Sequence, residues 1–219
     1  MNTMNNDFIN RISAKRFPIF ELFKYGVTEQ DCINEIKAAC AFFGMPMPAS
    51  IDNLTYLPYG QTMFVNRNRE SFADDILCYD LAELKRLGVT GKHAFTLIMT
   101  HENAHRLMQN TPIEGVNNGQ WEQELIADFF MGVRAGIEGI PHSALDAVRS
   151  GLKDTPGAKT HPTGKLRSDI ISYGYTWVGN MDLIHHKKRT MQEYYNIFME
   201  WLQKHKGEIR QAQVPFYGY

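Results

Sequence analysis

The stretch "FTLIMTHENAHRLMQN" at residues 95–110 places two histidines and a glutamate inside an otherwise apolar run. Polar groups that are buried without partners destabilise a fold, so their presence in such a run requires a reason. His101, Glu102 and His105 follow the pattern H-E-x-x-H. Residues four apart on a helix lie roughly 40° apart around its axis, so both imidazoles point the same way. The stretch predicts a helix that either binds a metal ion or bonds its histidines to backbone carbonyls.

The H-E-x-x-H pattern fits the chemistry of a catalytic zinc ion. Zinc prefers nitrogen and oxygen ligands in a tetrahedron, and a catalytic site leaves one position for water. The ion lowers the pKa of that water towards roughly 7, which makes hydroxide available at neutral pH. Glu102 directly follows the first histidine and can take the proton from the water. We therefore expect His101 and His105 to be metal ligands and Glu102 to be the general base.

A third ligand is expected from the next helical stretch, "QWEQELIADFFMGVRAG" at residues 120–136. Glu124 and Asp128 lie one helical turn apart and share a face of that helix. Glu124 can coordinate the metal. Asp128 can accept a hydrogen bond from the far nitrogen of His101 and so fix the tautomer of the imidazole. The alternative is an ordinary exposed acidic pair, although two phenylalanines directly follow Asp128.

The rest of the chain predicts an α+β fold that is mostly helical. Residues 54–68 are rich in Thr, Tyr, Phe and Val around a Pro-Tyr-Gly turn, which indicates a hairpin or a small β-sheet. The segment 150–164 contains prolines and glycines and is expected to be irregular. Helical periodicity and end signals predict helices at about 28–44, 80–88, 92–110 and 120–136, a short one after Pro141, one from about 165, and a last long one at about 182–206.

The length of 219 residues suits a single domain. Within residues 1–219 we distinguish an N-terminal helical segment (1–53), a catalytic core (54–178) and a C-terminal helix with a tail (179–219). Hydrophobic residues make up 43% of the chain, which is enough to form a core.

Charge and hydropathy limit the expected partners. The chain has 23 basic and 24 acidic residues and a formal net charge of −1, so no nucleic-acid partner is expected. The N-terminus "MNTMNNDFIN" has no apolar leader, and no stretch reaches the roughly 18 apolar residues of a membrane span. We therefore expect a soluble, cytoplasmic protein and leave export by a signal-free route open. The sequence does not predict the oligomeric state.

The three cysteines predict no disulfide framework and no zinc knuckle, because Cys32, Cys40 and Cys78 are odd in number and lack C-x-x-C spacing. Two ways of keeping the site latent stay open. The Cys78 thiol could occupy the open metal position, although a buried core thiol is the commoner arrangement. The aromatic tail "VPFYGY" could pack on the body of the protein or block the cleft.

The motifs together resemble a known family. H-E-x-x-H followed on the next helix by E-x-x-x-D resembles the gluzincin metallopeptidases. The segment "THPTGKLR" adds an H-P-x-x-x-x-R pattern with His161 and Arg167. With "ELIADFFMGVRAGI" and "GIPHSALDAV", this is similar to the CAAX prenyl protease and heat-shock membrane protease family of zinc peptidases. "LPYGQTMFVNRN" looks like that family's edge strand, and the resemblance covers roughly residues 54–170.

The resemblance implies a zincin-like fold and a zinc-dependent endopeptidase with one Zn²⁺ ion. It also implies that His161 donates a hydrogen bond to the oxyanion of the tetrahedral intermediate. Arg167 would hold either the substrate or the acidic groups of the site. On one continuous helix these two residues would lie about 120° apart, so they converge only if His161 lies on the turn before the helix. Pro162 favours that arrangement, because proline suits the first turn of a helix.

Two alternatives share some of these features. Immunity-repressor-cleaving metallopeptidases pair H-E-x-x-H with an E-x-x-A segment on the next helix and differ in substrate. A non-catalytic zinc-binding interaction module would use the same ligands as a scaffold. The family's best-known members are integral membrane enzymes, so this chain would be a soluble member. Its expected partner is a protein or peptide substrate that pairs with an edge strand near Met63 to Asn66.

Overall fold

The computed structural model describes residues 28–48, 50–53, 62–66, 75–79, 91–110, 120–153, 156–159 and 161–217. Within these ranges the chain is mostly helical, which confirms that part of the predicted fold class. The helices are α2 (Glu29–Phe43), α4 (Lys92–Asn110), α5 (Gln120–Ile137), α6 (His142–Lys153), α7 (Gly164–Tyr173), the π-helix η3 (Gly174–Gly179), α8 (Asn180–Ile184) and α9 (Met191–Tyr217). The strands are β1 (Ser50–Asn53), β2 (Thr62–Asn66) and β3 (Asp75–Tyr79).

Helix α2 begins and ends where its sequence signals predict. The Thr28 side chain accepts a hydrogen bond from the Asp31 backbone N–H, and the Asp31 carboxylate accepts one from the Thr28 N–H at 2.8 Å, which forms a capping box. Gly44 ends the helix in the left-handed conformation with φ 65°, which glycine adopts without strain. Its apolar face, including Ile36 and Cys40, is buried.

The three strands form a sheet in the order β1-β3-β2, with β1 parallel and β2 antiparallel to β3. Strand β2 therefore has a free edge among the strands described, and it also contacts α4. Most of the stretch 54–68 around β2 lies outside the described residues, so the hairpin stays a prediction. The helix expected at 80–88 also lies outside them.

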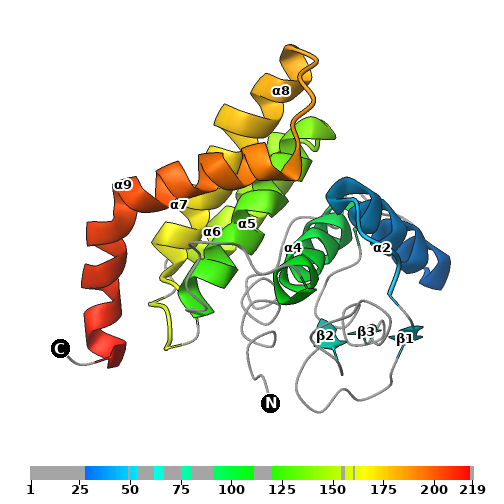
Figure 1. Cartoon of the computed structure of the whole chain (residues 1–219), viewed down its shortest axis with the longest axis horizontal. Helices are drawn as coiled ribbons and strands as arrows, with labels where there is room; N and C mark the ends of the chain where they lie inside the picture. Colours follow the sequence, from blue (N-terminus) through cyan, green and yellow to red (C-terminus); the bar gives the residue numbers. More distant parts are fainter. Residues whose placement is uncertain are drawn as a thin grey trace.

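The helices pack side by side, and α4 lies between α2 and α5 (Figure 1). Helix α7 and the π-helix η3 pack on α5, and α9 covers the aromatic side of α5 through Phe129, Phe130 and Phe198. A second apolar cluster joins α2, α4, α5 and α6. Helices α4 and α5, which carry the predicted ligands, are thus held from both sides. Among the described helices, none combines the length and the apolar character needed to cross a lipid bilayer.

The C-terminal region differs from its prediction. Instead of one helix at about 182–206, α8 ends at Ile184 and α9 runs from Met191 to Tyr217. The intervening turn is held by Asp182, whose carboxylate accepts hydrogen bonds from Arg189 Nε at 2.7 and 2.9 Å. The prediction was wrong because apolar residues on the two sides of residues 185–190 keep helical spacing, whereas this partly buried ion pair closes a turn between them. Helix α6 also extends to Lys153, inside the stretch that was expected to be irregular.

Candidate metal centre

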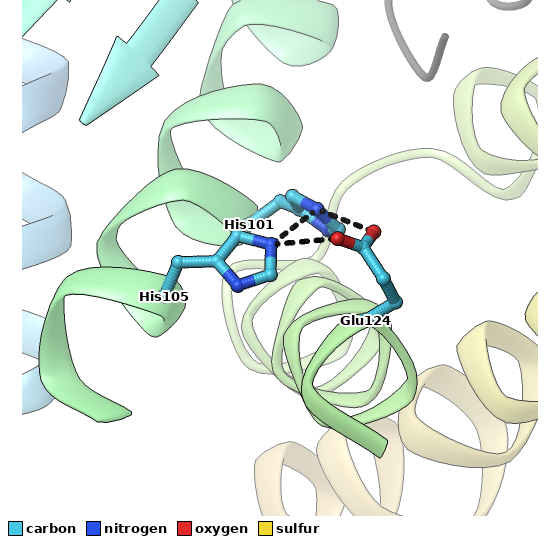
Figure 2. Close-up of side chains that lie close together, drawn as sticks. All are labelled: His101, His105 and Glu124. Carbon is cyan, nitrogen blue, oxygen red and sulfur yellow. Dashed lines mark hydrogen bonds and ion pairs between the residues drawn. The ribbon is translucent and has the colours of Figure 1, made fainter. Parts of the chain in front are cut away.

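Three predicted ligands converge where α4 passes α5 (Figure 2). His101 Nε2 lies 3.4 Å from Glu124 Oε2, and His105 Nε2 lies 3.4 Å from Glu124 Oε1. The two imidazole Nε2 atoms are 3.0 Å apart. One potential ligand atom from each residue lies within 4.8 Å of the other two, so these three side chains could hold one metal ion.

The distances between the candidate ligand atoms are close to those around a tetrahedral metal ion. Bonds of about 2.0–2.2 Å to nitrogen and oxygen hold ligand atoms about 3.3–3.6 Å apart in a tetrahedron. Each imidazole nitrogen lies in that range from one oxygen of Glu124, His101 from Oε2 and His105 from Oε1, both at 3.4 Å, and the 3.0 Å between the two imidazole nitrogens is slightly shorter. Glu124 Oε2 is buried and accepts no hydrogen bond within the described part of the chain. A cation between the three groups would satisfy this oxygen.

The electrostatics of the site favour a cation. Burial opposes ionisation of Glu124, but the neighbouring His105 and His101 outweigh it and hold the pKa of this carboxyl well below its usual range. Burial would lower the pKa of His101, but contacts with Asp128 and Glu124 raise it to about 9. Both carboxylates therefore favour positive charge at the place where the imidazoles meet.

Asp128 lies behind the candidate ligands, as the sequence predicts for a residue that orients a metal-binding histidine. Its Oδ1 atom is 3.1 Å from His101 Nδ1, on the side of the ring opposite Glu124. Burial would raise the pKa of Asp128, but the charge of Arg167 and the contact with His101 lower it. An ionised Asp128 favours a proton on His101 Nδ1 and so leaves Nε2 free to bind a metal.

Arg167 is almost completely buried, with 1% of its surface exposed. Its Nε and Nη2 atoms donate to the two carboxylate oxygens of Asp128 at 2.6 and 3.0 Å. Nη2 also lies 3.6 Å from Glu124 Oε2. Burial would lower the pKa of Arg167, but Asp128 outweighs it and raises the pKa further. Two roles were expected for Arg167, and these contacts fit the second, in which it holds the acidic groups of the site.

His161 lies on the turn before α7, which brings it to the same site as Arg167. Its Nε2 atom is 3.7 Å from Glu124 Oε2, and 1% of the residue is exposed. Helix α7 begins at Gly164 with Thr163 as its N-cap, so Pro162 precedes the helix instead of lying in its first turn. The two residues converge because the chain changes direction between them.

Glu102 is also buried, with 1% of its surface exposed. Its negative charge contributes to the raised pKa of Arg167, so it acts on the same cluster from α4. The site therefore joins four acidic or basic groups to the three candidate ligands: Glu102, Asp128, His161 and Arg167.

Some residues that support the site were not predicted. Arg134, on α5, is buried and donates to Glu35 Oε2 on α2 at 3.2 Å and to Thr100 Oγ1 on α4 at 3.0 Å. These hydrogen bonds link α4 and α5, the two helices that carry the candidate ligands, at Thr100, the residue before His101. The sequence signal was a single arginine in the apolar run "FFMGVRAGI".

The two expected latency devices have different outcomes. Cys78 lies in β3, and its side chain is outside the described residues, so its role stays a prediction. Phe216, from the tail segment, lies in α9, and its ring centroid is 5.9 Å from that of Trp121. This residue of the tail therefore packs on the body of the protein, whereas Val214 is exposed.

Comparison of the chain with protein-family models, with curated proteins and with solved structures finds no match in any of the three.

Proposed function

We propose that this chain is a zincin-like, zinc-dependent endopeptidase that hydrolyses peptide bonds in protein or peptide substrates. The observation that supports the proposal most is the convergence of His101, His105 and Glu124, with ligand atoms within 4.8 Å of one another. Two imidazoles and one carboxylate are a ligand set of catalytic zinc sites, and they leave one position open.

The side chains around the ligands supply the other functions that peptide hydrolysis needs. A zinc ion at this site would polarise the peptide carbonyl and lower the pKa of water. Glu102 would take the proton from the attacking water and pass it to the leaving amine. His161 would donate a hydrogen bond to the oxyanion as negative charge develops there. Asp128 would keep His101 oriented, and Arg167 would balance the charge of Asp128.

An extended substrate would pair with an edge of the small sheet. Among the described strands, β2 (Thr62–Asn66) is at the end of the order, and it contacts α4, the helix that carries the histidines. An unpaired strand edge can bind an extended peptide through backbone hydrogen bonds. This would hold an unfolded segment next to the proposed metal.

The variant Glu102→Gln tests the proposed mechanism. It removes the base but keeps the size and shape of the side chain, so zinc content should match the parent while cleavage of an unstructured protein is abolished. Glu122→Gln is the matched control on α5, because Glu122 is not among the three converging ligands. It should keep both zinc and activity. Parent-like cleavage by Glu102→Gln would show that the mechanism is wrong.

One observation favours a second candidate, a non-catalytic zinc-binding module. The side chains of His101 and Glu124 are 1% and 2% exposed and that of His105 is 13% exposed, and structural zinc sites are typically closed. For such a module, neither the parent nor any variant would cleave. A repressor-specific peptidase would differ from our proposal in keeping its rate after His161→Ala, for which we expect a large loss.

A further inference from the structure

The turn that carries His161 is braced by its own backbone. Ala158 and His161 exchange two hydrogen bonds, from Ala158 N to His161 O at 2.9 Å and from His161 N to Ala158 O at 3.1 Å. Gly157 adopts φ +84°, and a Cβ atom there would lie 3.0 Å from the backbone nitrogen of Thr163. The position of Ala158 therefore determines the position of the His161 backbone.

A tryptophan from α5 holds this turn. The indole Nε1–H of Trp121 donates to the Ala158 carbonyl oxygen at 2.9 Å. Trp121 is 1% exposed and lies in the first turn of α5, one turn before Glu124. The same helix thus supplies a candidate metal ligand and the donor that fixes the neighbouring turn.

The C-terminal end of α9 covers this tryptophan. The ring of Phe216 packs on Trp121 with an interplanar angle of 55° and is partly buried in the same apolar cluster. In Figure 1 the red end of α9 descends beside the yellow turn that precedes α7. A chain segment far from the ligands in sequence therefore contacts the residue that supports His161.

We propose that Trp121 is a positioning residue for His161, and that the end of α9 holds Trp121 in place. The connection runs from Phe216 to the indole ring, from the indole N–H to Ala158, and from Ala158 to His161. The catalytic consequence rests on the proposed function, in which His161 stabilises the oxyanion. Trp121 itself would touch neither the substrate nor the metal.

The variant Trp121→Phe removes the indole donor and keeps an aromatic ring for Phe216. One lost hydrogen bond should lower kcat by about 5- to 10-fold, with KM and zinc content unchanged. Trp201→Phe is the matched control, because Trp201 lies in the same apolar cluster and stacks on His205 of α9. The control should keep the parent kcat.

A second pair of variants tests the end of α9. Phe216→Ala removes the ring that covers Trp121 and should also lower kcat, whereas Val214→Ala, at a position that is 46% exposed, should not. In a His161→Ala background neither Trp121→Phe nor Phe216→Ala should lower the residual rate further. An equal loss in both backgrounds would overturn the proposal, since it would indicate a general effect on α5.

Nuclear magnetic resonance of the imidazole nitrogens separates this proposal from the proposed function. The His161 signals are identified by their absence in His161→Ala and are recorded in the zinc-loaded protein. They should shift in Trp121→Phe and Phe216→Ala and stay unchanged in the two controls. Unchanged His161 signals in both test variants would overturn the positioning role. Shifted signals in a protein that cleaves no substrate would uphold that role and contradict the peptidase.

Discussion

Asp128 connects the candidate ligand His101 to the buried side chain of Arg167. One carboxylate oxygen lies 3.1 Å from His101 Nδ1, and both oxygens accept hydrogen bonds from Arg167. The carboxylate thus has two functions, since it orients an imidazole and balances the charge of a buried guanidinium. Its effect on a bound metal can be separated from its effect on the fold.

We predict that Asp128→Asn weakens metal binding by about 10- to 100-fold, because the amide no longer favours the proton on His101 Nδ1. The measurement is a competition titration with a chromogenic zinc chelator. Asp169→Asn is the control, since Asp169 is a partly exposed acid on α7 that pairs with Lys165. Equal zinc affinity in the parent and Asp128→Asn would show that Asp128 does not orient the ligand.

Some of these residues could be predicted from the sequence and others could not. Helical geometry alone places His101 beside His105, and Glu124 beside Asp128, because their spacing determines their relative direction. The pairing of Arg167 with Asp128 depends on how α7 packs against α5, which spacing within one helix does not determine. Trp121 was missed for the same reason, because its partner Ala158 lies on a distant turn.

Helix α5 and the π-helix η3 approach each other backbone to backbone. A Cβ atom at Gly136 would lie 2.6 Å from the Asn180 nitrogen and 2.7 Å from the Tyr175 carbonyl oxygen. On the opposite helix, a Cβ atom at Gly174 would lie 2.5 Å from the Phe129 carbonyl oxygen. Glycines on both helices thus allow the two backbones to touch, and any larger residue would push them apart.

The variant Gly136→Ala should lower the free energy of unfolding by about 1–3 kcal/mol, because backbone atoms cannot move away as a flexible side chain can. Urea denaturation measures the change. Gly207→Ala on α9 is the control, since a Cβ atom there meets nothing within 4 Å. It should raise stability by about 0.5–1 kcal/mol, as alanine favours a helix over glycine. Equal stabilisation by both substitutions would contradict the close approach.

Arg134 links α2, α4 and α5, and it pairs with one buried acid, Glu35, and one exposed acid, Glu138. Glu35→Ala leaves the buried guanidinium without its buried acidic partner and should cost about 1–3 kcal/mol of stability. Glu138→Ala removes a partner whose side chain is 42% exposed and should cost about 0–1 kcal/mol. Thermal unfolding of the two variants compares them. A larger loss in Glu138→Ala would show that the buried pair does not hold these helices together.

The elements differ in how well the sequence predicted them. Helix α2 was predicted to within a residue because Thr28 and Gly44 are local start and stop signals with a known geometry. The helix at 92–110 was also confirmed, since its periodicity is continuous. The break between α8 and α9 and the π-helix η3 were not predicted. Both depend on contacts made in the folded chain, namely the Asp182–Arg189 pair and the glycine-lined contact with α5.

At the scale of the whole molecule, the proposed metal would connect α4 with α5 and so contribute to stability. A ligand that binds only the folded state stabilises it by about 4 kcal/mol when its free concentration is about 1,000 times Kd. We predict that removing zinc with a chelator lowers the unfolding temperature of the parent and that added zinc restores it. In Glu124→Ala neither treatment should shift the transition, and a shift as large as the parent's would place the metal elsewhere.

The central claim is that two helices hold one zinc ion through His101, His105 and Glu124. Its most direct test is the zinc content of the purified protein, measured by plasma mass spectrometry after reconstitution and removal of free metal. We predict about one zinc ion per chain in the parent and close to none in His105→Ala and Glu124→Ala. A parent that retains no zinc, or variants that retain as much as the parent, would contradict the claim.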